Sequence, residues 1–186
     1  MKTEQTNEHE LMIRLASGQM EALSEIVDRY QNQVLSIAYR FLNDWTKAED
    51  VAQETFLRIY KSAGKYTPQA RFTTWLYRIV VNLCLDEKRK QTKMPVSIEE
   101  ASYTPPVDNS EYNDAERKET IELVKKAINE LPERQRLAVI LHRYENLSYD
   151  QICEVTEWTK SAVESLLVRA YENLRKKLSK IENFKE

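Results

Sequence analysis

The chain has 186 residues, 31% charged and 41% apolar, which fits one or two small folded domains and argues against a membrane-spanning protein. Its 28 basic and 30 acidic residues give a formal charge of −2, so any surface that binds a polyanion must be local. Only two glycines are present, too few for a phosphate-binding loop or a turn-rich β fold, and we therefore predict an all-α protein.

Four helical patterns are predicted in the first half of the chain. Apolar residues recur there at steps of three and four, which is the period of a helix with one buried face. The patterns cover residues 8–17, 22–41, 48–60 and about 73–89. Gly18 can end the first helix, and residues 62–71 are expected to form a loop because they contain Gly64 and Pro68. Short connections between the helices predict a compact bundle.

An acidic linker is predicted at residues 92–114, which hold three of the five prolines and five acids against one base. Fully extended, it reaches at most about 75 Å. A further amphipathic helix follows from Ile121 and is interrupted by Pro132, and a next helix is expected to carry Leu137, Ile140, Leu141 and Tyr144. The expected domains are therefore residues 1–91 and 115–186, joined by the linker.

A helix-turn-helix is predicted from Ser148 onward. Ser148 and Gln151 have the spacing of a capping box, so a short helix is expected to begin at Tyr149. Thr159 is the preferred cap of a second, longer helix, with Ser161 as the competing cap. Residues 160–180 carry six bases against two acids, which favours salt-sensitive binding to phosphates. The alternative is a solvated helix end whose lysines complement the helix dipole.

A second segment interleaves aromatic and basic side chains. Tyr66, Phe72, Trp75 and Tyr77 lie within 12 residues, among Lys65, Arg71 and Arg78. Aromatic rings can stack on unpaired bases while cations hold the backbone. Trp75 shares its spacing with Ile79 and is expected in the core, whereas Tyr77 and Arg78 are expected nearer the polar face.

The two cysteines, Cys84 and Cys153, are expected to be reduced thiols of a cytoplasmic protein, with a disulfide or a redox role as the minority alternative. With His9 and His142 as the only histidines, no metal-ligand set is expected. No nucleophile–base constellation is apparent, so no catalytic residue, enzyme activity or cofactor is predicted. No apolar run is long enough to span a membrane, and no secretory leader is recognised.

Four segments together resemble the extracytoplasmic-function sigma factors, the group-four members of the sigma-70 family. Residues 48–56 (AEDVAQETF) and 71–82 (RFTTWLYRIVVN) resemble their region two, and residues 131–136 (LPERQR) and 147–152 (LSYDQI) resemble their region four. The resemblance implies a protein that binds bacterial core RNA polymerase, through the β′ clamp helices and the β subunit, and directs it to promoter DNA. It also implies a cytoplasmic location and an anti-sigma protein as a partner.

The resemblance assigns roles to particular residues. Those expected to dock on the polymerase are Asp50, Gln53 and Glu54. Those expected at the melted −10 element are Lys65, Tyr66, Arg71, Tyr77, Arg78, Asn82 and Arg89. Those expected at the −35 duplex are Lys160, Ser161, Glu164, Ser165 and Arg169. In residues 161–166 (SAVESL), Glu164 and Leu166 replace two bases common in the family, so Glu164 would repel a phosphate or accept from cytosine N4.

Three other readings remain open at this stage. A helix-turn-helix regulator would bind duplex DNA without acting as a sigma subunit, and would need no aromatic loop. A helical adaptor would bind only protein and show no salt-sensitive DNA binding. The third alternative, an enzyme, is supported by no motif in the sequence.

Overall fold

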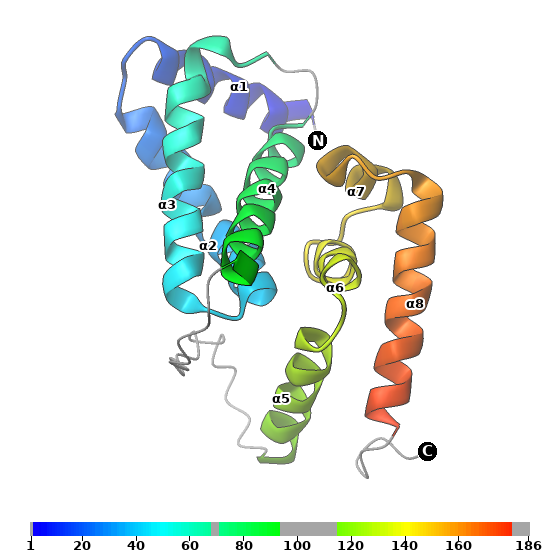
Figure 1. The fold of residues 1–186 in the computed structure, drawn as a ribbon. Coiled ribbons are helices and arrows are strands. Elements are labelled where there is room, and N and C mark those ends of the chain that lie inside the picture. Colours follow the sequence, from blue (N-terminus) through cyan, green and yellow to red (C-terminus); the bar gives the residue numbers. More distant parts are fainter. Residues whose placement is uncertain (1, 68–70, 94–114, 180–186) are drawn as a thin grey trace. The chain divides into compact units, whose positions relative to one another are not determined.

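The computed structural model describes residues 2–67, 71–93 and 115–179 (Figure 1). Within these ranges every regular element is a helix, which confirms the predicted all-α class. The elements are α1 (Lys2–Ala16), α2 (Glu21–Leu42), α3 (Trp45–Ser62), the 3₁₀ turn η1 (Ala63–Lys65), α4 (Phe72–Lys93), α5 (Ala115–Asn129), α6 (Glu133–Val139), the π-helical turn η2 (Ile140–Tyr144), α7 (Tyr149–Thr156) and α8 (Lys160–Leu178). None of the described helices is long and apolar enough to cross a membrane.

The chain divides into two units, with α1–α4 in the first and α5, α6 and α8 in the second. In the first unit α2 packs against α1, α3 and α4, and α3 also packs against α4. The stripe predicted along α2 is its buried face: Ile26, Val34, Ile37 and Phe41 are all 0% exposed. Full burial of such side chains contributes about 1.5–3 kcal/mol each, which is why the period of the sequence determines how α2 packs.

Local capping sets the junction between α2 and α3. Asn43 ends α2 in the left-handed conformation, with φ of 55°, and its amide donates to Tyr39 O at 2.8 Å. Asp44 then caps α3, because its Oδ1 accepts from the Lys47 amide at 3.1 Å. Among the described residues, two further non-glycine positions have a left-handed φ, Asn146 (53°) and Glu157 (60°).

In the second unit, α6 and α5 both pack against α8. The helix predicted from Ile121 does stop before Pro132, since α5 ends at Asn129 and α6 begins at Glu133. The next helix, predicted to carry Leu137, Ile140, Leu141 and Tyr144, is present as α6, which continues without a break from Val139 into the π-helical η2. Leu137, Ile140 and Leu141 stay fully buried through this change.

Several boundaries differ from the sequence expectation. α1 begins at Lys2 and α5 at Ala115, both earlier than the apolar pattern indicated, since a helix can extend beyond its buried stripe through polar residues. α4 continues to Lys93, past the expected boundary at residue 91, and the rest of the acidic linker predicted at 92–114 lies outside the described residues.

Candidate nucleic-acid interface

The caps of the predicted helix-turn-helix are present. The Ser148 amide donates to Gln151 Oε1 at 2.8 Å, and the Gln151 amide donates to Ser148 Oγ at 3.2 Å, which is a reciprocal capping box. α7 begins at Tyr149, as predicted. Thr159 caps α8, since its Oγ1 accepts from the Ala162 amide at 3.3 Å, so the competing cap at Ser161 was the wrong alternative.

Capping and burial fix which side of α8 faces outward. Val163, Leu167 and Ala170 are at most 1% exposed and form its buried face. All five residues expected at the −35 duplex are exposed, on the remaining sides of the helix: Lys160, Ser161, Glu164, Ser165 and Arg169. The N-terminal part of a recognition helix is the part that contacts base edges in a helix-turn-helix. Four of the five residues lie in the first two turns.

One of these candidates is paired within the motif. Lys160 Nζ lies 2.9 Å from Asp150 Oδ1 of α7. The pKa of Lys160 is raised, first by the hydrogen bond to Asp150 and then by the charge of Asp150, with a smaller contribution from Glu164. Val168 and Tyr171 also stand on α8, with 58% and 41% of their surface exposed. Neither was predicted from the sequence as a contact, although both fall between the buried and the basic positions of α8.

Aromatic side chains gather beside the loop that follows α3. The ring centroids of Tyr66 and Trp75 are 5.0 Å apart, and Phe72 lies 6.2 Å from Tyr66 and 5.7 Å from Trp75. We call these three residues the aromatic cluster. Burial raises the pKa of the Tyr66 phenol, with a smaller contribution from the charge of Glu8.

Two expectations for this segment were wrong in their burial. Tyr77, expected near the polar face, is only 5% exposed, whereas Trp75, expected in the core, is partly exposed. A ring buried this far is not available to stack on a base. The helical period alone could not separate the two, because residues 75 and 77 lie on opposite sides of a helix that other helices cover from more than one direction.

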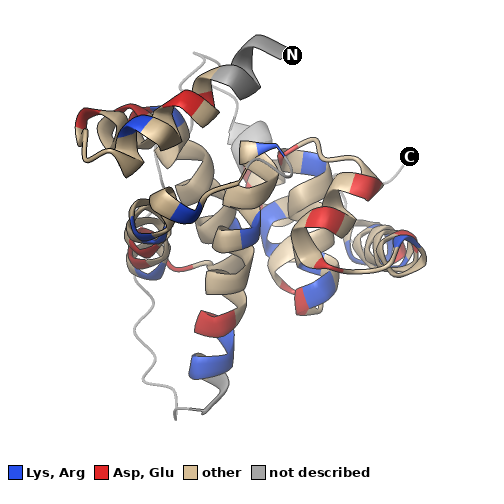
Figure 2. Cartoon of the chain, turned by 90° about the horizontal axis from the view of Figure 1, so that it is seen from above, with Lys and Arg blue, Asp and Glu red and all other residues tan. Residues whose placement is uncertain are grey.

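The other residues expected at the −10 element lie at or near the surface. Lys65, Arg71, Asn82 and Arg89 are exposed, and Arg78 is partly exposed. Lys65 and Arg71 flank residues 68–70, which are outside the described ranges. Arg89 pairs with Asp86 at 3.0 Å. In Figure 2 basic and acidic residues are interspersed along the helices, in line with the nearly balanced charge of the whole chain.

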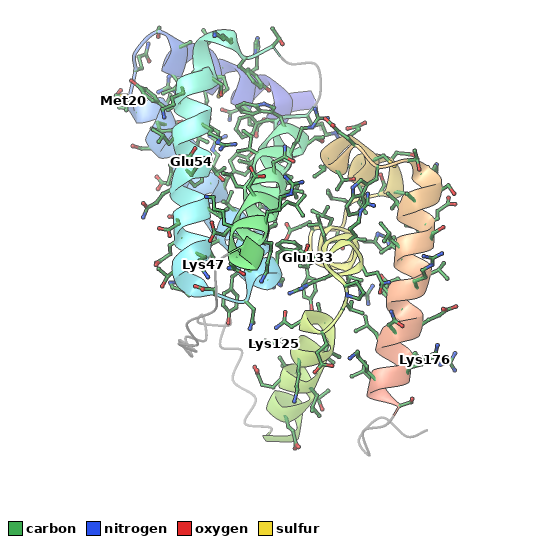
Figure 3. The ribbon with its side chains drawn as sticks, in the orientation of Figure 1. Met20, Lys47, Glu54, Lys125, Glu133 and Lys176 are labelled. Carbon is green, nitrogen blue, oxygen red and sulfur yellow. The ribbon has the colours of Figure 1, made fainter. Side chains whose placement is uncertain are left out.

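An acidic and apolar face runs along the outside of α3. Asp50 and Gln53 are exposed, and Glu54 lies midway along the helix (Figure 3). Arg58 Nε donates to Glu54 Oε1 at 2.9 Å and thereby lowers the pKa of that carboxyl. Leu57 and Tyr60 continue the same side at 43% and 45% exposure. These two residues were not predicted from the sequence as part of the docking surface, although both lie outside the buried stripe of α3.

Among the described residues, no group of three or more His, Cys, Asp or Glu side chains is arranged to hold a metal ion. Both cysteines are free thiols, Cys84 buried and Cys153 partly exposed, so the alternative of a disulfide was wrong.

Comparisons with known proteins agree with the two units. The family model described as Sigma-70 region 2 matches residues 26–94, and that of Sigma-70, region 4 matches residues 121–174. The chain is 31% identical to the RNA polymerase sigma-H factor of Pseudomonas aeruginosa, over 94% of this chain and 95% of the relative. It is 31% identical to the ECF RNA polymerase sigma-E factor of Haemophilus influenzae, over 94% and 97%. The corresponding values for SigW of Bacillus subtilis are 30%, 91% and 98%.

Two solved structures share the fold. CnrH, solved in complex with the cytosolic domain of CnrY, superposes with a TM-score of 0.69 at 23% identity, covering 94% of this chain and 99% of that chain. RpoE of Bartonella quintana, solved with the anti-sigma factor NepR, gives a TM-score of 0.68 at 22% identity, covering 86% and 97%.

Proposed function

The chain belongs to the extracytoplasmic-function sigma factors of the sigma-70 family, which direct RNA polymerase to promoters, and on this premise we propose how its residues divide that task. We propose that residues 1–91 engage the polymerase and the melted −10 element, that residues 115–186 bind the −35 element as duplex, and that residues 92–114 link them. The observation that carries the proposal is the occurrence, in one chain, of a capped helix-turn-helix and a separate helical unit with a partly exposed aromatic cluster.

The −35 assignment is supported by the first turns of α8. Lys160, Ser161 and Ser165 are exposed there and offer an ammonium and two hydroxyl groups to phosphates and base edges. Arg169 stands one turn further along and supplies a second cation. Glu164 lies among them as the one acid, and its carboxylate suits a cytosine N4 donor better than a phosphate.

The −10 assignment is supported by the composition of the loop region rather than by a closed pocket. Tyr66 and Trp75 present partly exposed rings within stacking reach of each other, beside the exposed cations Lys65 and Arg71. An unpaired base can stack on such rings for about 1–3 kcal/mol, comparable with the cost of extruding it from duplex DNA. Arg78, Asn82 and Arg89 are also proposed to contact the −10 element. Tyr77 is not proposed as a direct contact, because it is buried.

The polymerase-docking surface is proposed on α3. Asp50, Gln53 and Glu54 supply its polar part, and Leu57 and Tyr60 add exposed apolar area. Mixed polar and aromatic surfaces of this kind are common at protein interfaces. We propose that the chain itself is not catalytic, that the polymerase supplies the chemistry, and that both work in the cytoplasm.

We also propose regulation by an anti-sigma protein that covers polymerase-binding surfaces. The Bartonella sigma factor of the same fold was solved in complex with an anti-sigma factor.

Run-off transcription with bacterial core polymerase tests the proposal. Promoter-specific transcripts should appear only when the chain is added, including from the promoter of its own gene. The alternative, a regulator that does not act as a sigma subunit, is less favoured because it would leave the region 2 match unused. It predicts duplex binding but no promoter-specific transcript when core polymerase is present, and that result would overturn the assignment.

Core binding itself tests the α3 surface. Asp50→Ala and Leu57→Ala should each weaken binding to core polymerase while leaving −35 duplex binding unchanged. Glu21→Ala is a matched control, since Glu21 is an exposed acid in the first turn of α2. Equal core affinity of all three variants would remove α3 from the docking surface.

A further inference from the structure

A buried hydrogen bond links α1 to the helix behind the aromatic cluster. The Tyr30 hydroxyl of α2 donates to Glu8 Oε1 of α1 at 2.7 Å. Both side chains are only 8% exposed. A carboxylate is rarely buried to this extent without a partner, so this contact is a costly one to leave unmade.

From Tyr30 the contacts continue to the cluster. The Tyr30 ring lies 5.2 Å from Phe72, which in turn contacts Tyr66 and Trp75 at 6.2 and 5.7 Å. These separations are within the range in which aromatic pairs attract one another. A displacement of Tyr30 would therefore be transmitted to the cluster by direct packing.

A second contact reaches the cluster from the same helix. α1 packs against η1, the turn that precedes Tyr66. His9, next to Glu8, places its ring 6.2 Å from the Tyr66 ring. The Glu8 charge also acts on the Tyr66 phenol. α1 thus touches Tyr66 directly, through His9, and indirectly, through Tyr30 and Phe72.

We propose that Glu8 is a positioning residue for promoter opening: its hydrogen bond to Tyr30 fixes α1 and the aromatic cluster in the arrangement that receives an unpaired base. This inference rests on the proposed −10 function of the cluster. Glu8 is too buried to contact DNA and acts only through Tyr30 and the rings that follow. The ligand of the cluster is an unpaired nucleobase, which would stack on the rings of Tyr66 and Trp75.

The first test observes the cluster without any promoter. The full chain contains three tryptophans, Trp45, Trp75 and Trp158, and 5-fluorotryptophan labelling gives each a ¹⁹F NMR signal. Glu8→Ala should move or broaden the Trp75 signal and leave the signals of Trp45 and Trp158 in place. Tyr30→Phe, which removes the same hydrogen bond at minimal cost in volume, should act on the same signal.

Two matched variants separate the hydrogen bond from a general effect of charge. Glu8→Gln keeps an acceptor for the Tyr30 hydroxyl and should restore the Trp75 signal. Glu10→Ala removes an exposed acid from the same helix and should change none of the three signals. If Glu8→Gln behaves like Glu8→Ala, or if all three tryptophan signals shift together, the proposal is wrong.

The second test measures function in the holoenzyme. Permanganate reactivity of −10 thymines should fall about tenfold with Glu8→Ala, within the effect expected when a buried hydrogen bond is lost, and by less than twofold with Glu8→Gln. Binding of a −35 duplex should be unchanged in every variant. If Glu8→Ala displaces the Trp75 signal but opens promoters normally, the proposed role of Glu8 in promoter opening is wrong. A wild-type chain that opens no promoter would refute the proposed function instead, and the NMR result would still decide the positioning.

Discussion

Lys160 Nζ of α8 lies 2.9 Å from Asp150 Oδ1 of α7, so a cation at the start of the proposed recognition helix is held by a carboxylate of the preceding helix. Exposed pairs of this type contribute little to stability, and their main effect here concerns the electrostatics of DNA binding. Asp150 neutralises a cation that would otherwise be offered entirely to phosphates. We therefore expect the pair to set how strongly the proposed recognition helix attracts duplex DNA.

Asp150→Asn should tighten binding to duplex DNA of unrelated sequence and steepen its salt dependence. One additional phosphate contact by Lys160 changes the slope of log K against log salt by about 0.9. Fluorescence anisotropy over a salt series measures this slope. Asp28→Asn, an exposed acid on α2, is the matched control and should leave the slope unchanged. If Asp150→Asn has the same slope as the unchanged chain, Lys160 does not contact a phosphate.

Glu164→Lys should alter which −35 sequence is preferred as well as the overall affinity. A carboxylate that accepts from cytosine N4 discriminates against the wrong base by about 1–3 kcal/mol, and a lysine there would favour guanine instead. Binding to a set of −35 variants, each changed at one base pair, measures this preference. Glu172→Lys makes the same charge change on an exposed position further along α8 and should raise affinity without changing the preference. Identical profiles for the two variants would place Glu164 away from the bases.

Thr159→Ala should destabilise the second unit by about 1 kcal/mol, because the Ala162 amide loses its side-chain acceptor at the start of α8. Ser161→Ala is the control, since Ser161 stands in the first turn but is not the cap. Urea unfolding monitored by circular dichroism compares the two. An equal loss in both variants would assign the effect to the first turn in general rather than to the cap.

Cys84 should resist thiol reagents at pH 8 until the fold opens, whereas Cys153 should react in the folded chain. Burial raises the pKa of Cys84 from 9.0 to about 12, with a smaller contribution from Glu87. Because the folded-state pKa lies above the unfolded value, the stability contributed by this thiol is present below pH 9 and is lost as the pH rises toward 12. The free energy of unfolding, measured from pH 8 to 11, should therefore fall less steeply with pH in Cys84→Ala than in Cys153→Ala.

The features that were predicted correctly from the sequence depend on residues close together in the chain. The caps at Ser148 and Thr159 are of this kind, because a cap and the amide that it accepts from are two or three positions apart. The exposed face of α8 followed from the spacing of its apolar residues. The all-α class followed from the same periodicity and from the scarcity of glycine.

The features that were missed depend on residues far apart in the chain. Glu8 and Tyr30 are 22 positions apart, and nothing in the sequence marks Glu8 among 30 acids as a buried one. The burial of Trp75 and Tyr77 was the reverse of the prediction for a related reason. The helices that pack against α4 determine which of its sides is covered. The domain boundaries and the individual DNA and polymerase contacts remain predictions.

In the ranges that the structure describes, three helix ends or turns adopt the left-handed conformation at residues that carry side chains: Asn43, Asn146 and Glu157. Glycine meets no Cβ penalty in that conformation, asparagine meets a small one, and glutamate meets a larger one. Glu157 lies in the turn between α7 and α8, so the motif contains a local conformational cost that one codon change could remove. Under selection for growth at higher temperature, replacement of Glu157 by glycine would remove this cost and stabilise the turn. Every side chain on the exposed face of α8 would stay unchanged.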